Sequence, residues 1–396
     1  MKTHQGFCEQ KEQVAAHDLL EALQRVGWNF SDAPIASGVH SLHSYPAKFI
    51  PDIPRTLISL FSKPGDLVLD PFCGGGTTGV EAVEGERAYV GVDANAFAVL
   101  LSKLKLRFVT DATRDLVSRH ADHVSSADLT ARDKDWRPNI PNVHKWYDPV
   151  VFEELVALRA SILLMEDSDA VDFGLLALSS SASKLSYQDS ETRYVSKPKS
   201  MEAGATAKTY SREVRRMLSV LPDKAPRLPA EVVLGDARAS SSFATLSDGS
   251  VDLAVTSPPY PNAYDYHLYH RFRLFWLGGE GPKDLRAVEV GSHLKNQTDA
   301  EPTESYLRDM RQMFTEVRRV LRSGAYFALV VGSGIHKGET FETAEELSAL
   351  ANSLGFETFA CVDRQLPTSR RSVTHTGRRL QTEQVLVLRA TERKAR

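Results

Sequence analysis

Three consecutive glycines, Gly74-Gly75-Gly76, stand between a strand-like segment and a helix-like one, and they constrain the fold of this chain most strongly. The strand-like run 66–69 leads directly into Asp70 and this turn. Glycine tolerates positive φ and lets the backbone approach a ligand closely. The turn lacks the Lys-Ser/Thr ending of a phosphate-binding loop and the usual dinucleotide spacing, so both of these interpretations are disfavoured.

Two further apolar runs end on an acid. Residues 88–92 lead to Asp93, and residues 231–234 lead through Gly235 to Asp236. In doubly wound sheets, a carboxylate about 20 residues beyond the glycine turn accepts hydrogen bonds from the ribose hydroxyls of an adenosine-containing ligand. Asp93 has this position. Asp236 can accept from an adenine amino group. Together with Asp70, these acids predict a ligand site at one edge of a parallel sheet.

The next strand-like run, 251–256, stops on the turn Ser257-Pro258-Pro259-Tyr260. Two prolines make this turn stiff, so the carbonyls and the Ser257 hydroxyl form a pocket rich in hydrogen-bond acceptors. The Tyr260 ring can lie flat on a planar group. Such a turn can also be a plain strand-ending loop, but the glycine motif upstream favours a site that grips the exocyclic amino group of a nucleobase.

The two motifs together resemble those of the S-adenosylmethionine-dependent amino-methyltransferases of DNA. The resemblance covers roughly residues 40–107 and 231–388, and 43–51 resembles the block placed against the methionine end of the cofactor. It implies that Ser257, Pro258, Pro259 and Tyr260 are catalytic. The cofactor-binding residues that it implies are Lys48, Phe49, Asp70, Pro71, Phe72, Gly74, Gly76, Thr77, Asp93, Asp236 and Ala237.

The order of apolar runs predicts an α/β fold, a doubly wound seven-stranded methyltransferase (Rossmann-like) sheet with a mainly helical insertion. Residues 304–321 have helical spacing, with Gly324 as the expected C-cap, and 325–331 follows as a strand. Residues 343–353 predict a further helix. The resemblance implies that the last strand, 383–388, is antiparallel.

The segment 111–230 is too long for a simple crossover between strands. It predicts an inserted, mainly helical subdomain, with helices at 148–165 and 171–183 and a loop over 192–207. We expect two further parts of the chain, an N-terminal helical extension at 1–39 and a catalytic domain formed by 40–110 and 231–396.

Several basic groups are candidate nucleic-acid contacts, although charged surface residues are often only solvated. Within the insertion, Lys197 and Lys199 are candidate phosphate ligands, and Tyr210 is a candidate stacking group. Arg271, which follows the Ser-Pro-Pro-Tyr turn in sequence, is a further candidate. The segment 364–379 contains five arginines and no acid, so Arg370, Arg371 and Arg378 are the preferred phosphate clamp.

Composition limits the remaining classes. The net charge of −3 requires any nucleic-acid surface to be locally basic. The three cysteines show no metal-like spacing and fit a reducing cytoplasm, and we expect no metal, no signal peptide and no membrane span. The expected partners are double-stranded DNA and, where the chain belongs to a restriction system, a cognate restriction endonuclease.

Ser257 also bears on the target base. Serine at this position resembles the cytosine-N4 enzymes more than the adenine-N6 enzymes, because a neutral hydroxyl pulls less strongly on the amine than a carboxylate. Adenine N6 remains an alternative, as does an RNA amino-methyltransferase or a non-catalytic DNA-binding module. No Pro-Cys motif of a carbon methylase occurs.

Overall fold

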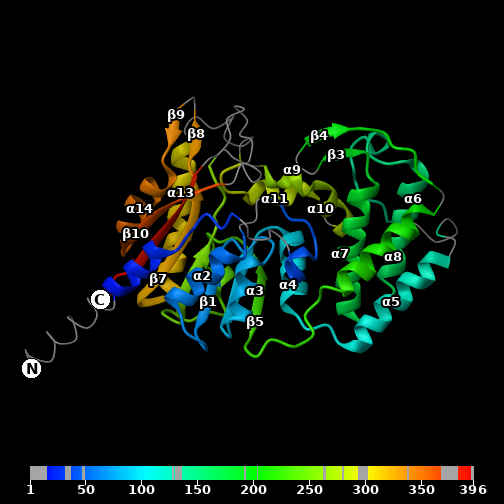
Figure 1. The fold of residues 1–396 in the computed structure, drawn as a ribbon. Coiled ribbons are helices and arrows are strands. Elements are labelled where there is room, and N and C mark those ends of the chain that lie inside the picture. The colour runs from blue at the N-terminus through cyan, green and yellow to red at the C-terminus, as the bar shows by residue number, and fades with distance from the viewer. Residues whose placement is uncertain are drawn as a thin grey trace, which may run out of the picture.

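A seven-stranded sheet forms the centre of the protein (Figure 1). The computed structural model describes residues 16–31, 37–46, 50–126, 129, 136–190, 193–202, 204–261, 265–278, 281–292, 302–336, 339–366 and 382–393. The sheet order is β10-β11-β7-β6-β1-β2-β5. Its strands are β1 (Leu67–Asp70), β2 (Ala88–Asp93), β5 (Ala230–Leu234), β6 (Val251–Thr256), β7 (Leu321–Gly332), β10 (Phe356–Gln365) and β11 (Thr382–Ala390).

Strand directions follow the doubly wound pattern. The pairs β1–β2, β1–β6, β2–β5 and β6–β7 are parallel, whereas β11 runs antiparallel to both β7 and β10. The predicted α/β class and the antiparallel last strand are confirmed. Because the parallel strands all end at the same edge, the turns that follow β1, β2, β5 and β6 meet there.

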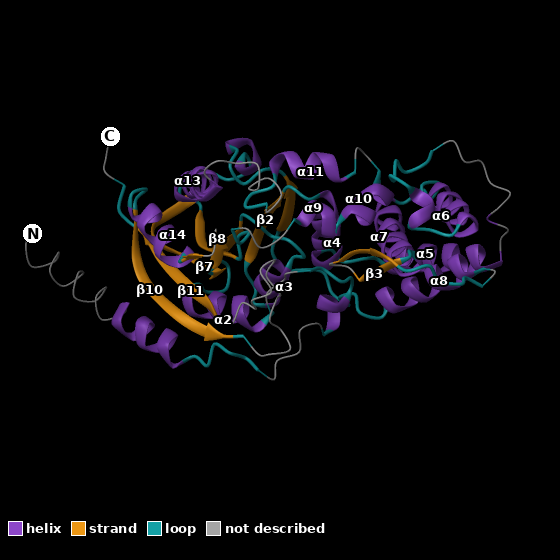
Figure 2. Ribbon diagram, turned by 90° about the horizontal axis from the view of Figure 1, so that it is seen from above, coloured by secondary structure: helices purple, strands orange, loops and turns teal. Residues whose placement is uncertain are grey.

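Helices cover both faces of the sheet (Figure 2). They are α2 (Asp52–Phe61), α3 (Thr77–Glu84), α4 (Ala96–Leu106), α13 (Pro302–Val320) and α14 (Thr343–Asn352). Successive residues of a strand point to opposite faces. In β6, Leu253 and Val255 join the core under α2, while Ala254 joins the core under α13. The centre of a strand buried on both faces must be apolar, which explains the run Leu253-Ala254-Val255.

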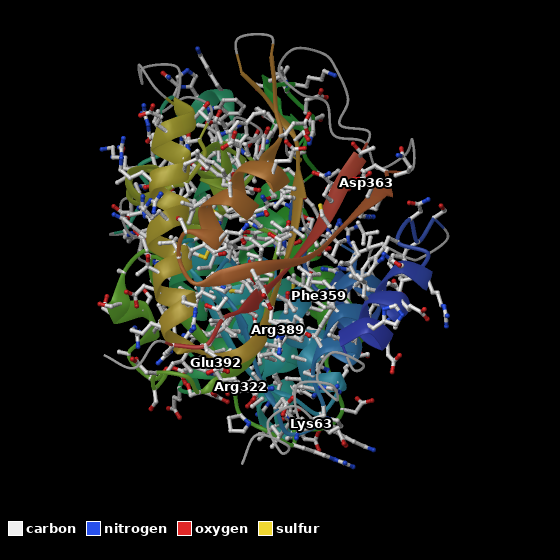
Figure 3. All side chains as sticks on the ribbon, turned by 90° about the vertical axis from the view of Figure 1, so that its left-hand side faces the viewer. Lys63, Arg322, Phe359, Asp363, Arg389 and Glu392 are labelled. Atoms are coloured by element: carbon white, nitrogen blue, oxygen red, sulfur yellow. The ribbon has the colours of Figure 1, made fainter. Side chains whose placement is uncertain are left out.

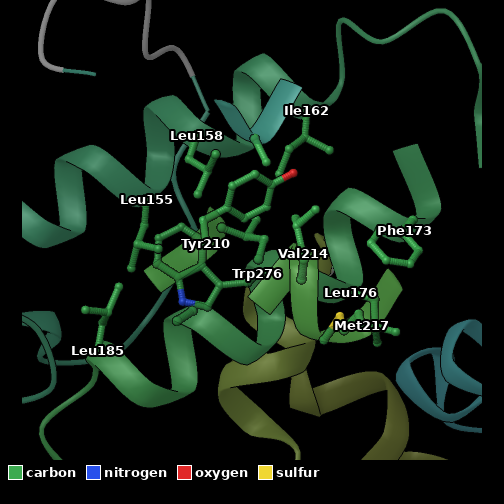
Figure 4. Packing of buried hydrophobic residues seen from close by; sticks show 14 of the residues in the cluster. Leu155, Leu158, Ile162, Phe173, Leu176, Leu185, Tyr210, Val214, Met217 and Trp276 are labelled. Atoms are coloured by element: carbon green, nitrogen blue, oxygen red, sulfur yellow. The ribbon is translucent and has the colours of Figure 1, made fainter. Parts of the chain in front are cut away.

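A second group of helices occupies the segment between β2 and β5. These helices are α5 (Asp111–Ser126), α6 (Pro149–Ile162), α7 (Ser168–Leu185) and α8 (Ala205–Leu218). Trp276, from α10 (Arg271–Leu277), is fully buried among them (Figure 4), and its Nε1 donates to the Tyr147 hydroxyl at 3.0 Å. Thus α10 joins this helical core to the chain that follows β6. The division into domains at the predicted boundaries stays a prediction.

Two local predictions are wrong. The expected loop over 192–207 contains β4 (Arg193–Ser196), which pairs with β3 (Gln188–Ser190), and its last residues begin α8. Gly324 does not cap a helix, because α13 ends at Val320 and β7 begins at the next residue. Gly324 instead lies within β7 at φ 78°, where the pairing with β6 shifts register. A glycine with positive φ supports such an irregularity.

The outer edge of the sheet is β10, which Figure 3 shows with Phe359 and Asp363 beside the N-terminal helix at 16–25. Leu23 and Trp28 from this N-terminal segment are buried in the core of that face. The short helices α9 (Tyr266–Tyr269) and α11 (Pro282–Val288) follow β6 in the chain. Strand β8 (Gly334–His336) pairs with β9 (Glu339–Phe341). In the described part of the chain, no helix is both long and apolar enough to cross a membrane.

Candidate active site

The glycine turn after β1 has the backbone conformation that its sequence predicts. Gly74 and Gly76 have φ of 48° and 75°, and Gly76 is the N-cap of α3. A Cβ on Gly76 would lie 3.1 Å from the Cα of Ser102, so this position requires glycine. The Ser102 hydroxyl donates to the Gly74 carbonyl at 2.8 Å, and the buried Lys105 Nζ donates to the Gly75 carbonyl at 2.5 Å. Helix α4 therefore holds the turn in shape.

Tyr45 lies against the glycine turn. A Cβ on Gly75 would approach Cγ of the Tyr45 ring to 3.1 Å, so glycine permits this close packing. The ring is parallel to Phe97 with centroids 6.2 Å apart, and it lies 4.7 Å from the ring of His270. Burial raises the pKa of the Tyr45 phenol well above its usual value, which keeps it neutral.

The carboxylate of Asp93 organises the same turn. One of its oxygens accepts from the Gly74 backbone N–H and the other from the Asn95 backbone N–H, both at 2.8 Å. Burial raises the Asp93 pKa to about 6, although these two hydrogen bonds act in the opposite direction. Each carboxylate oxygen retains a lone pair that can accept a further donor.

Asp70 has a structural position behind the turn. It is buried, and its Oδ1 accepts from the Thr256 hydroxyl at 2.6 Å and from the Phe72 backbone N–H at 3.1 Å. Burial raises its pKa to about 6. Because Thr256 is the last residue of β6, Asp70 links the glycine turn to the Ser-Pro-Pro-Tyr turn at 257–260. Asp70 does not line the cavity described below, so its predicted contact with the cofactor is not supported.

Asp236 follows β5 and is clamped by Arg238. The guanidinium donates to both carboxylate oxygens, with Nη2 2.7 Å from Oδ2 and Nε 2.9 Å from Oδ1. The same arginine reaches Asp309 on α13 at 2.7 Å. The Asp236 carboxylate is thus fixed at the sheet edge by a bidentate contact.

The Ser-Pro-Pro-Tyr turn at 257–260 lies beside β7 and β11. The Ser257 hydroxyl donates to the Val330 carbonyl at 3.2 Å, and the Tyr260 hydroxyl donates to Glu383 at 2.9 Å. Burial raises the Tyr260 pKa well above its usual value, and the nearby Glu383 carboxylate raises it further. Both hydroxyls are therefore neutral and already hydrogen-bonded in the protein alone.

One cavity connects these parts. Of the predicted residues it is lined by Pro71, Phe72, Gly74, Thr77, Asp93, Asp236, Ala237, Ser257 and Pro259. Gly76, Pro258 and Tyr260 are not among its lining residues, and Lys48 and Phe49 lie outside the described residues. Sequence reasoning missed further lining residues, namely Tyr45, Cys73, Gly75, Ala94, Asn95, Tyr266, Leu285, Val288, Glu289 and Val290. Tyr45 belongs to the block 43–51 and could have been found, whereas no pattern marks the residues of α11.

The candidate nucleic-acid residues have different surroundings. Lys197 is exposed and pairs with Asp189 at 2.7 Å, and Lys199 donates to the Ser186 carbonyl at 2.8 Å. Arg271 is buried, its Nη1 donates to the Leu268 carbonyl, and its guanidinium lies 5.0 Å from the Trp146 ring centroid. Burial likewise removes Tyr210 from the surface, so neither Arg271 nor Tyr210 is presented to DNA. Arg370, Arg371 and Arg378 lie outside the described residues.

Comparison with known proteins finds a family resemblance in the N-terminal quarter of the chain. A sequence model described as DNA methylase matches residues 7–104. The type II methyltransferase M.MjaII of Methanocaldococcus jannaschii is 36% identical over 69 residues, which cover 17% of this chain and 13% of that enzyme. The type II methyltransferase M.Cfr9I of Citrobacter freundii is 42% identical over 72 residues, which cover 18% of this chain and 22% of that enzyme.

These matches span less than a quarter of each of the two relatives. Among solved structures, a SAM-dependent methyltransferase from Methanosarcina mazei aligns over 85% of this chain and 98% of its own, with 14% sequence identity and a TM-score of 0.34. The family match ends before the turn at Ser257, so the role of that turn depends on its geometry. Residues 7–104 are therefore similar to the DNA methylase family, and the matched part of the chain is similar to type II methyltransferases.

Proposed function

We propose that this protein transfers a methyl group from S-adenosylmethionine to the exocyclic amino group of a flipped base in double-stranded DNA, at cytosine N4. The observation that carries the proposal is the single cavity lined by the glycine turn, Asp93, Asp236 and Ser257. A cofactor bound by the first three would lie beside the group that grips the base. Positioning of this kind can supply most of the rate enhancement.

The lining fits the cofactor. Asp93 offers free carboxylate lone pairs for the two ribose hydroxyls while it holds Gly74. The Ala237 backbone and the Asp236 carboxylate line the same cavity and would offer an adenine edge a donor and an acceptor, and Phe72, Leu285 and Val288 would supply apolar contact. When bound, the cofactor supplies a methyl group on a positively charged sulfur, which an amino nitrogen can attack in line.

The base-gripping turn has to make that nitrogen nucleophilic. The lone pair of an exocyclic amine is delocalised into the ring, so the amine must be drawn toward tetrahedral geometry. In this protein the Ser257 proton is donated to the Val330 carbonyl, so the Ser257 oxygen lone pairs remain available to accept from the amine. The Pro258 carbonyl is the second acceptor, and the Tyr260 ring stacks on the base. The proton released by the methylated amine leaves to solvent.

Cytosine is proposed because Ser257 is a neutral hydroxyl where adenine enzymes of this family more often have a carboxylate. The basic groups for the DNA backbone are proposed to be Arg370, Arg371 and Arg378, with Lys197 and Lys199 as a second surface. Figure 1 shows the β3–β4 hairpin on the same upper side of the molecule as α9 and α11, which would let one DNA duplex reach both. A cognate restriction endonuclease and a cytoplasmic location belong to the same proposal.

Product analysis tests the proposal. The protein is incubated with isotope-labelled S-adenosylmethionine and either unmethylated genomic DNA or RNA, and the digested nucleosides are identified by mass spectrometry. We expect label in 4-methylaminocytosine from DNA. Label only in 6-methyladenine would replace the cytosine assignment, and label only in RNA would replace the DNA assignment. Calorimetric cofactor binding without any transfer would instead identify a non-catalytic binding module.

A further inference from the structure

One arginine ties the polypeptide just before Tyr45 to the inserted helices. Arg216, near the end of α8, donates from Nη1 to the Ser41 carbonyl and from Nη2 to the Leu42 carbonyl, both at 2.8 Å. These carbonyls lie at the end of the short 3₁₀ turn η1 (Gly38–Ser41), where the last backbone acceptors of a helix lack helical partners. The planar guanidinium spans both of them and so fixes the chain three residues before Tyr45.

The Arg216 guanidinium is itself held within the insertion. Its Nε donates to Glu213 Oε2 at 3.1 Å, and the same oxygen accepts from the Ser180 hydroxyl of α7 at 2.9 Å. Lys184, also on α7, pairs with the other Glu213 oxygen. The Glu213 side chain is only 1% exposed, and a carboxylate buried to this extent is stable only with such donors. Arg216 is therefore fixed between α7, α8 and the segment 41–42.

The segment 42–45 has no regular secondary structure, yet it is tightly packed. Leu42 is fully buried in the core that the inserted helices form. His43 is buried as well, with its Nδ1 2.8 Å from the Ser44 carbonyl oxygen, and Arg273 of α10 donates from Nη2 to Ser44 Oγ at 3.2 Å. Because close-packed interiors transmit displacements, a shift at the start of this segment would move the residue at its end.

That last residue, Tyr45, forms part of the wall of the proposed cofactor cavity. Its ring packs directly on the glycine turn, since a Cβ on Gly74 would lie 3.3 Å from Cε1 of the ring and a Cβ on Gly75 would lie 3.1 Å from Cγ. The ring therefore has the glycine turn on one side and is attached, through three residues of backbone, to the contact with Arg216. Its place sets the shape of the cavity at the glycine turn.

We propose that Arg216 is a positioning residue for cofactor binding, which acts through the carbonyls of Ser41 and Leu42 to hold Tyr45 in the cavity wall. The inserted helices would thereby be part of the S-adenosylmethionine site, although no described residue of α5, α6, α7 or α8 lines the cavity. The inference rests on the proposed function for the identity of the cofactor. It assigns a role to the buried carboxylate of Glu213, which holds the Arg216 guanidinium.

Replacing Arg216 with alanine tests the tie. Arg215→Ala is the matched control, because Arg215 is the neighbouring residue of α8, is 65% exposed and pairs with Asp122 at 2.8 Å. In isothermal titration calorimetry, we expect S-adenosylmethionine affinity to fall about tenfold in Arg216→Ala, within the range of couplings between residues of one network, and to stay within about twofold in Arg215→Ala. Arg216→Lys keeps the charge beside Glu213 but cannot span both carbonyls, so it should also weaken binding. This variant replaces Arg216→Ala if circular dichroism shows that the alanine variant does not fold.

A double-mutant cycle separates positioning from a general loss of stability. Arg216→Ala should cause no further loss of affinity when it is added to Tyr45→Ala, because the side chain that it positions is gone. Its effect should instead add to that of Asp236→Asn, since Asp236 is held at the sheet edge by Arg238. Additive losses for Arg216→Ala and Tyr45→Ala would overturn the positioning role.

A spectroscopic readout needs no cofactor. In protein labelled with [13Cζ]tyrosine, the Tyr45 resonance is the one missing from Tyr45→Phe, and we expect it to shift in Arg216→Ala but not in Arg215→Ala. An unmoved resonance, or equal cofactor affinities for Arg216→Ala and Arg215→Ala, would also overturn the inference. If the wild type bound no S-adenosylmethionine, the proposed function would fail and the role of Arg216 in cofactor binding would fall with it. The expected affinity changes in a protein that transfers no methyl group would support the positioning role and contradict the proposed reaction.

Discussion

Replacing Asp93 with alanine should weaken S-adenosylmethionine binding by roughly ten- to a hundredfold. The Asp93 oxygens already accept from the Gly74 and Asn95 backbone N–H groups at 2.8 Å, and their remaining lone pairs are proposed to accept the ribose hydroxyls. A hydrogen bond to a charged group contributes about 1.5–3 kcal/mol, and about 1.4 kcal/mol corresponds to tenfold in affinity. Losing the equivalent of one such bond therefore gives the stated range, and losing both gives more.

Isothermal titration calorimetry measures this affinity directly. Ser102→Ala is the matched control, because it removes a support of the glycine turn, the bond to the Gly74 carbonyl, without touching the cavity. It should weaken binding far less than Asp93→Ala. Since the Asp93 pKa is raised to about 6, affinity should fall as the pH drops through about 6 and the carboxylate becomes protonated. Binding by Asp93→Ala within twofold of wild type would refute the assignment.

Three further changes have defined outcomes. The folded-state pKa of Asp70 is raised from 3.8 to about 6, so its contribution to stability is present below pH 3.8 and is lost as the pH rises through about 6. In chemical denaturation, the unfolding free energy of the wild type should decrease by up to about 3 kcal/mol as the pH rises across this range. That of Asp70→Asn should not show this decrease. Trp276→Ala should cost about 3–5 kcal/mol in chemical denaturation, whereas alanine at the exposed Val150 should cost almost nothing. Replacing Arg370 and Arg371 with alanine should weaken binding to all DNA sequences and leave cofactor binding intact. The slope of log affinity against log salt concentration should become about 2 units less steep. If alanine at Lys197 and Lys199 has these effects instead, the DNA-backbone contacts belong to the insertion.

The sheet and part of the cavity lining were predictable because they depend on local sequence. A strand buried on both faces must be apolar, and the glycine turn needs residues that accept positive φ, so each leaves a pattern that can be recognised. The same local logic located Asp93 and Ser257, which the structure brings to one cavity although they are far apart in sequence.

Other features depend on contacts between distant segments and leave no such pattern. Arg271 has the composition of a phosphate ligand, yet its guanidinium packs near the Trp146 ring inside the helical core. Arg364 belongs to the arginine-rich segment, but Glu383 and the Trp28 carbonyl hold it in the interior. Gly324 follows a helix as a C-cap would, and only the pairing of β7 with β6 shows that it lies within a strand.

The central claim is that one cavity presents the cofactor to a base amine gripped by Ser257. The most direct test is tritium transfer from labelled S-adenosylmethionine to unmethylated DNA by the wild type and by Ser257→Ala, with cofactor binding measured on the same preparations. We expect the wild type to transfer the label. The Ser257→Ala protein should bind the cofactor with an affinity within about twofold of the wild type but transfer on the order of a hundredfold more slowly. A loss of this size is typical when one polar group that stabilises a transition state is removed. Equal transfer rates for the two proteins, or no transfer by the wild type, would contradict the central claim.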